Sequence, residues 1–158
     1  MPEILKGRII SNKQMAKDIY LLTLKLEKKV NPQPGQFFML KITQGLNPLL
    51  PRPFSWFEIS DSGKEVKFLY QIVGRGTELL SQKIKGEPIS LLGPLGRGFN
   101  LKPARGKVYL IAGGVGVGFS TTIPFLRSSF LICIAQCSAK YSIQPYESIR
   151  IKSDHSHL

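Results

Sequence analysis

The segment Ile19-Tyr20-Leu21-Leu22-Thr23-Leu24-Lys25-Leu26 carries the clearest structural signal in the sequence. Successive side chains of a β-strand point to opposite faces, so the even-numbered residues from Tyr20 to Leu26 would lie on one side. An apolar row of this kind is typical of a strand that covers a hydrophobic core. We therefore predict a β-strand over this segment.

Further short strands are expected around this segment, separated by turns rich in proline and glycine such as 31–35. One short helix is expected over 77–84, with Thr77 as its N-cap. The buried face of this helix would carry Leu79, Leu80 and Ile84. Many short strands joined by tight turns indicate an all-β antiparallel barrel or sandwich. The other expected strands cover 4–10, 36–42, 53–59, 66–73 and 88–92.

The pattern of the sequence changes from residue 107, and its composition changes near residue 118. An apolar run over 108–112 leads into the glycine-rich turn 113–118, which is how a parallel dinucleotide-binding unit begins. All 15 glycines lie at or before Gly118. A second strand is expected near 130–135, but the β-branched stretch 119–124 does not favour a helix. We therefore predict a β-domain over 1–103 and the start of an incomplete α/β domain over 104–158.

Composition excludes several classes of protein. Of the 158 residues, 42% are apolar, which is enough for a folded core. The longest apolar run, 130–135, is far shorter than the roughly 20 residues that span a bilayer. Basic residues are scattered, whereas nucleic-acid binders gather them on one element. We expect a cytoplasmic protein that binds neither nucleic acid nor membrane, and the net charge of +12 suits an anionic cofactor.

Arg52-Pro53-Phe54-Ser55 is the first candidate binding motif. A guanidinium stays charged and can hold a diphosphate through two parallel hydrogen bonds. The hydroxyl of Ser55 could bond the edge of a flat heterocycle. Because Pro53 has no N–H, it indicates an edge strand, which suits a ligand groove. An exposed arginine ahead of an ordinary strand is the alternative interpretation.

The second candidate is the strand end Leu69-Tyr70-Gln71, followed by Gly74-Arg75-Gly76-Thr77. Two glycines permit a tight backbone, and N–H groups at a helix start would form an anion site together with the Thr77 hydroxyl. An ordinary glycine turn with an N-cap is the alternative. The glycine-rich loop 92–99 is a third shaped segment, which by itself specifies no ligand.

Five motifs occur in an order that resembles the ferredoxin-reductase-like flavoproteins, in which an FAD-binding barrel precedes a nicotinamide-binding lobe. Within that group, Arg-Pro-Phe-Ser and the run Gly76–Ser81 look most like the electron transfer subunits of dihydroorotate dehydrogenase B. The resemblance covers about residues 3–117. The motifs are Pro-Gly-Gln-Phe at 34–37, Arg-Pro-Phe-Ser at 52–55, Gly-Arg-Gly-Thr at 74–77, Gly-Pro-Leu-Gly at 93–96 and Ala-Gly-Gly-Val-Gly at 112–116.

This resemblance implies an oxidoreductase component of pyrimidine biosynthesis. Electrons would pass from a dihydroorotate dehydrogenase catalytic subunit, through a [2Fe–2S] cluster and FAD, to NAD⁺. No acid, base or nucleophile of this chain is required, and we assign no catalytic residue. Arg52 would contact the FAD diphosphate. The other implied cofactor-binding residues are Pro53, Phe54, Ser55, Leu69, Tyr70, Gln71, Gly76 and Thr77 for FAD, and Gly113, Gly114 and Gly116 for the nicotinamide nucleotide.

The sequence departs from the family after Gly118. A [2Fe–2S] cluster takes four ligands, whereas the chain has only Cys133 and Cys137. Together with His155 and His157 they match no zinc-site spacing, so we assign no metal site. We expect a truncated or divergent second lobe that binds NAD(H) weakly. The alternatives are another flavin reductase subunit of the same superfamily, or a non-catalytic remnant that binds FAD or a partner.

Overall fold

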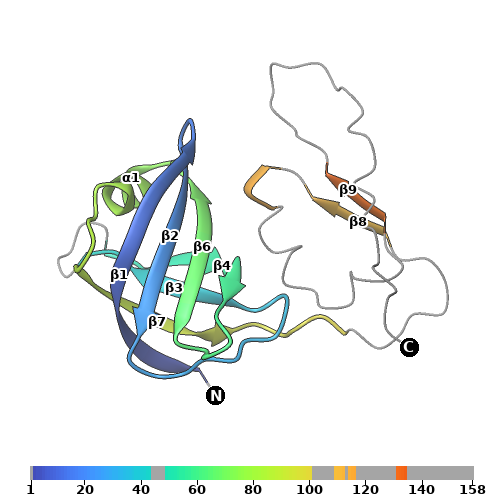
Figure 1. Cartoon of the computed structure of the whole chain (residues 1–158), viewed down its shortest axis with the longest axis horizontal. Helices are drawn as coiled ribbons and strands as arrows, with labels where there is room; N and C mark the ends of the chain where they lie inside the picture. Colours follow the sequence, from blue (N-terminus) through green and yellow to red (C-terminus); the bar gives the residue numbers. More distant parts are fainter. Residues whose placement is uncertain (1, 44–48, 101–108, 113, 117–130, 135–158) are drawn as a thin grey trace, which may run out of the picture.

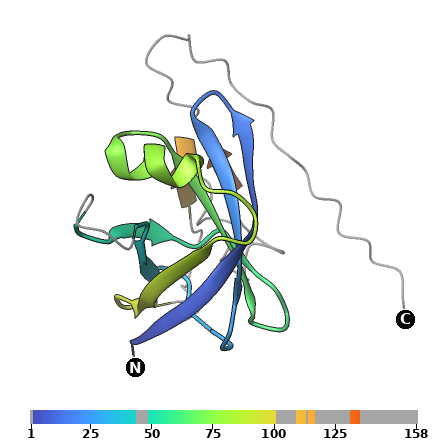
Figure 2. The ribbon, with the colours of Figure 1, turned by 90° about the vertical axis from the view of Figure 1, so that its left-hand side faces the viewer.

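The computed structural model describes residues 2–43, 49–100, 109–112, 114–116 and 131–134. Its main body is a seven-stranded antiparallel sheet in the order β4-β3-β7-β1-β2-β6-β5. The strands wrap around a common interior, and one short helix lies at one end of it (Figures 1 and 2). The elements of this body are β1 (Glu3–Ala16), β2 (Ile19–Leu26), β3 (Phe37–Lys41), β4 (Arg52–Ser55), β5 (Glu58–Ile59), β6 (Glu65–Gln71), α1 (Arg75–Ser81) and β7 (Pro88–Leu95).

Aromatic contacts between β4 and β6 close the sheet into a barrel. These strands lie near opposite ends of the strand order, yet Phe54 packs edge-on against Phe68 and Tyr70. The ring centroids are 6.3 and 5.9 Å apart, within the usual range for aromatic pairs. The predicted all-β barrel is therefore confirmed, and β4 occupies the edge position that Pro53 indicated.

The interior is filled by the apolar side chains that alternate along the strands. Leu22, Leu24 and Leu26 of β2 are all buried, as their spacing predicted. Phe38 and Phe68 are fully buried and meet edge-on with their ring centroids 6.0 Å apart. Every buried apolar residue found in the described part of the chain lies between Leu5 and Leu91. The described core therefore lies in the strands of the barrel, in α1 and in three residues of the connections between them, Val30, Ile42 and Trp56.

Two predictions for single elements are wrong in detail. The expected strand 53–59 is two strands, β4 and β5, with Trp56 and Phe57 between them. The expected helix 77–84 begins two residues earlier, at Arg75, and ends at Ser81. Leu80 is fully buried as predicted, but Ile84 lies beyond the helix and is 69% exposed.

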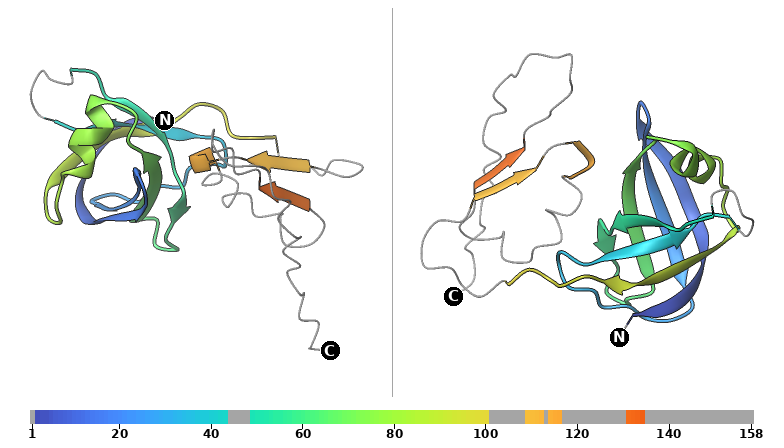
Figure 3. Two further views of the ribbon diagram at one scale, coloured as in Figure 1. Left: turned by 90° about the horizontal axis from the view of Figure 1, so that it is seen from above. Right: turned by 180° about the vertical axis from the view of Figure 1, so that it is seen from behind.

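A separate parallel pair follows the barrel in the sequence. β8 (Tyr109–Ala112) pairs with β9 (Leu131–Ile134), and the 3₁₀ turn η1 (Gly114–Gly116) comes after β8 (Figure 3). This pairing agrees with the predicted start of an α/β unit. The expected domain boundary at 103, Gly113, the stretch 119–124, Cys137, His155 and His157 lie outside the described residues. None of the helices described is long and apolar enough to cross a membrane.

Candidate functional site

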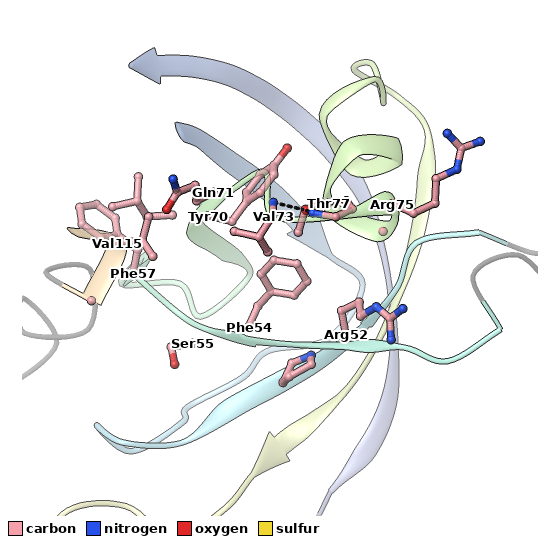
Figure 4. A pocket seen from close by; sticks show the side chains of 15 residues that line it. Arg52, Phe54, Ser55, Phe57, Tyr70, Gln71, Val73, Arg75, Thr77 and Val115 are labelled. Carbon is pink, nitrogen blue, oxygen red and sulfur yellow. Dashed lines mark hydrogen bonds between the residues drawn. The ribbon is translucent and has the colours of Figure 1, made fainter. Parts of the chain in front are cut away.

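An open pocket of about 640 Å³ lies where β4, β6 and the start of α1 meet (Figure 4). Its volume is in the range of small-molecule and cofactor sites. The lining includes two arginines and no carboxylate, so the pocket favours an anionic ligand. The lining residues are Arg52, Pro53, Phe54, Ser55, Phe57, Leu69, Tyr70, Gln71, Val73, Gly74, Arg75, Gly76, Thr77, Val115 and Gly116.

The two candidate motifs, about 20 residues apart in the sequence, form opposite walls of this pocket. All nine residues that the sequence assigned to FAD are among the lining residues. Of the three glycines assigned to the nicotinamide nucleotide, Gly116 lines the pocket, and Gly113 lies outside the described residues. The placement brings the candidate residues together, while their binding roles stay predictions.

Arg52 is the cation best placed to meet an anion. It begins β4, is exposed, and takes part in none of the ion pairs found among the described residues. Its side chain passes over the first turn of α1, where a Cβ on Gly76 would lie 3.2 Å from Arg52 Nε. Gly76 therefore leaves the space that the guanidinium side chain occupies. Arg75, in contrast, is paired with Glu78 at 3.3 Å.

The aromatic residues of the pocket form its floor. Phe54 is 8% exposed and Tyr70 is 3% exposed, because both side chains turn toward the core. Figure 4 shows Arg52 and Ser55 on either side of Phe54 along the same strand, and Ser55 is exposed. A cation, an apolar floor and a hydroxyl thus follow one another along β4. This order suits a long ligand with a charged part and a flat part.

Thr77 has a different role from the one the sequence indicated. Its hydroxyl donates to the carbonyl oxygen of Gly74 at 2.9 Å. It also accepts hydrogen bonds from the backbone N–H of Val73 at 2.9 Å and of Gly74 at 3.3 Å. Thr77 therefore closes the turn before α1 from inside the helix, instead of capping the helix from outside. Its hydrogen is used within the protein and is not directed at a ligand.

Sequence reasoning missed five of the lining residues as site residues. Gly74 and Arg75 belong to a motif that the sequence did single out, so their position was recoverable. Phe57 lies in the break between β4 and β5, which no local sequence pattern predicted. Val73, which is 80% exposed, and Val115 also carried no signal in the sequence.

Solved structures define the class of fold. The ferredoxin reductase of carbazole 1,9a-dioxygenase matches 77% of this chain and 38% of its own, with a TM-score of 0.66 and 24% identity. A ferredoxin NADP⁺ reductase from Neisseria gonorrhoeae, solved with bound FAD and NADP, matches 80% of this chain and 54% of its own, with a TM-score of 0.65 and 17% identity. A siderophore-interacting protein from Acinetobacter baumannii covers 84% and 57%, with a TM-score of 0.69 and 16% identity. The chain therefore has a ferredoxin-reductase-like fold.

Proteins related in sequence are more similar to this chain than the solved structures are. The chain is 41% identical over 110 residues to the electron transfer subunit of dihydroorotate dehydrogenase B (NAD⁺) from Clostridium acetobutylicum, covering 70% of this chain and 43% of that subunit. The same subunit from Clostridium perfringens is 39% identical over 114 residues, covering 72% and 44%. No family model matches the chain. The chain spans less than half the length of these relatives, and over its matched part it is homologous to dihydroorotate dehydrogenase B electron transfer subunits.

Proposed function

We propose that the chain binds FAD in this pocket and transfers electrons between a dihydroorotate dehydrogenase catalytic subunit and NAD⁺. The observation that carries the proposal is the convergence of both sequence motifs on one pocket with two arginines and no carboxylate. Similarity to the named electron transfer subunits, at about 40% identity, supports this choice of reaction and partner.

The described residues fit FAD in charge, shape and hydrogen-bonding capacity. FAD has an anionic diphosphate and a planar ring system. Arg52 provides a cation outside any described ion pair, and the missing side chain of Gly76 leaves room beside it. Phe54 and Tyr70 give an apolar floor, and Ser55 gives an exposed hydroxyl beyond it.

In this proposal the chain binds and orients the cofactor. Arg52 would hold the diphosphate through charge-assisted hydrogen bonds, which are stronger than neutral ones. Ser55 would bond a polar edge of the ring system, and the floor would exclude water from one side. Bound FAD would supply exchange between two-electron and one-electron carriers. We assign no proton transfer to any residue of this chain.

NAD(H) and the iron–sulfur cluster enter the proposal differently. The turn after β8, with Gly114 and Gly116, is the proposed start of nicotinamide contacts, and weak NAD(H) binding stays a prediction. The chain as printed contains two cysteines, fewer than the four ligands of a [2Fe–2S] cluster. Within the described ranges no three His, Cys, Asp or Glu residues are grouped to hold a metal ion.

An absorption spectrum of the purified protein tests cofactor binding directly. Flavin bands in the protein as purified, or after incubation with FAD and gel filtration, are expected. A protein that retains no flavin under either condition would overturn the proposal.

A second experiment distinguishes the proposed partner from the alternatives. Co-expression with a dihydroorotate dehydrogenase catalytic subunit should give a complex on gel filtration. That complex should reduce an artificial acceptor with NADH as the electron donor. Flavin binding without complex formation would favour another flavin reductase subunit, for which the solved reductases are the structural precedent. Flavin binding and complex formation without electron transfer would favour the non-catalytic remnant.

A further inference from the structure

A polar cluster behind the pocket joins α1 to the aromatic floor. Asn12, on β1, donates a hydrogen bond from Nδ2 to the carbonyl oxygen of Leu80 at 2.8 Å. The same nitrogen is 3.3 Å from the carbonyl oxygen of Lys83 and 3.5 Å from that of Ser81. The Oδ1 of Asn12 accepts a hydrogen bond from the Tyr70 hydroxyl at 3.1 Å. One side-chain amide therefore connects β1, β6 and the C-terminal end of α1.

The helix at one end of this connection needs external support. α1 has seven residues, far fewer than an isolated helix needs to be stable in water. Its first turn carries Gly76 and Thr77, which line the pocket, and its last turn carries Leu80. A short helix moves as a unit, so a bond to the Leu80 carbonyl also restrains the first turn. Asn12 thus acts on the helical wall without lining the pocket.

The other end of the connection is the aromatic floor. Tyr70 stacks on Tyr20 with ring centroids 5.6 Å apart and meets Phe54 edge-on at 5.9 Å. Because the Tyr70 hydroxyl donates to Asn12, a shift of the whole ring away from Asn12 would break the hydrogen bond. Burial raises the pKa of Tyr70 to about 12, so the hydroxyl keeps its hydrogen at neutral pH.

We propose that Asn12 is a positioning residue of the cofactor site, which fixes the spacing between α1 and the Phe54–Tyr70 floor. This inference rests on the proposed FAD function. An asparagine suits the task because its amide donates to carbonyls at one end and accepts from a hydroxyl at the other. Aspartate keeps the acceptor but cannot donate when ionised, and alanine keeps neither. Either replacement leaves the Leu80 carbonyl without this donor and lets α1 and the Phe54–Tyr70 floor move apart.

The test measures FAD affinity and stability in the wild type, four variants and one control variant. The variants are Asn12→Ala, Asn12→Asp, Tyr70→Phe and the double variant Asn12→Ala/Tyr70→Phe. Ser11→Ala is the matched control, since Ser11 is next to Asn12 on β1 and no hydrogen bond of its side chain is found. FAD affinity is measured by flavin fluorescence at a temperature where circular dichroism shows each protein folded. Urea unfolding without FAD gives the stability.

Both Asn12 variants should bind FAD about tenfold more weakly while folded. The double variant should bind about as weakly as Asn12→Ala alone, because the two residues act through one hydrogen bond. Ser11→Ala should bind as the wild type does. Tyr70→Phe, which loses only a hydroxyl, keeps the test available if Asn12→Ala does not fold.

The outcomes separate this inference from the function on which it rests. Wild-type protein that binds no FAD overturns both. Wild-type binding together with unchanged affinity in the folded Asn12 and Tyr70 variants, even at lower stability, overturns only the positioning role. Additive losses in the double variant would also overturn it, because they would mean that the two residues act independently.

Discussion

In the proposed site Arg52 is the main anion-binding residue, and Gly76 leaves room for its side chain. Arg52→Ala removes a charge-assisted contact that contributes about 1.5–3 kcal/mol, so FAD should bind about 10- to 150-fold more weakly. Arg97→Ala is the control, because Arg97 is exposed and does not line the pocket. Calorimetric titration with FAD measures both. Equal affinity of wild type and Arg52→Ala would remove Arg52 from the site.

Tyr70 should make the barrel less stable at alkaline pH. Burial raises its pKa to about 12, above the ordinary value near 10. The folded state therefore keeps a proton that the unfolded state releases. The stabilisation is complete below about pH 10 and is lost as the pH rises through about 12. Raising the pH from about 8 to about 12 should reduce the stability of the wild type more than that of Tyr70→Phe. Urea unfolding at each pH measures the stability of both proteins. A constant difference between them would contradict the shift.

At the scale of elements, a substitution in the first turn of α1 should affect stability and FAD binding in different directions. Gly76→Ala adds helix propensity of about 0.8–1 kcal/mol, but its Cβ would lie 3.2 Å from Arg52 Nε. We expect stability to stay level or rise while FAD affinity falls, because Arg52 must move. Ser81→Ala, in the last turn of the same helix, should leave affinity unchanged. Thermal unfolding and FAD titration measure the two effects. Lower stability with normal affinity would contradict this account.

Strand alternation and short motifs were enough to predict most elements and most of the residues that line the pocket. Ile19–Leu26 agrees residue for residue with β2, because a row of alternating apolar side chains has one favourable pairing. The break after Ser55 was not predictable, since Trp56 and Phe57 are both residues that favour strands. Asn12 could not be predicted as part of the site, because its hydrogen-bond partners are 58 and 68 residues away in the sequence. Local sequence patterns do not indicate such distant contacts.

At the scale of the whole molecule, the number of cysteines limits which electron carriers the chain can hold. Two cysteines cannot provide the four ligands of a [2Fe–2S] cluster. The isolated chain should therefore show flavin absorption without stoichiometric iron and sulfide, and metal analysis of the folded protein checks this. A full complement of iron and sulfide in a monomer would contradict the prediction.

The distribution of the core leads to the last prediction, that residues 1–103 fold and bind FAD on their own. The buried apolar residues found in the described part of the chain lie between Leu5 and Leu91, and thirteen of the fifteen pocket residues precede residue 78. Removing 104–158 therefore leaves the Phe54–Tyr70 closure and the Arg52–Gly76 contact intact. Among the described residues of the removed segment, Val115 and Gly116 are the ones lost from the pocket lining.

The fragment should unfold cooperatively in urea and bind FAD within about fivefold of the full chain, because one half-buried apolar contact is worth less than about 1 kcal/mol. The full chain under the same conditions is the reference, and the fragment carrying Arg52→Ala is the control for specific binding. A non-cooperative fragment would mean that the second lobe completes the core. A cooperative fragment without FAD affinity would instead mean that the turn after β8 supplies an essential part of the site.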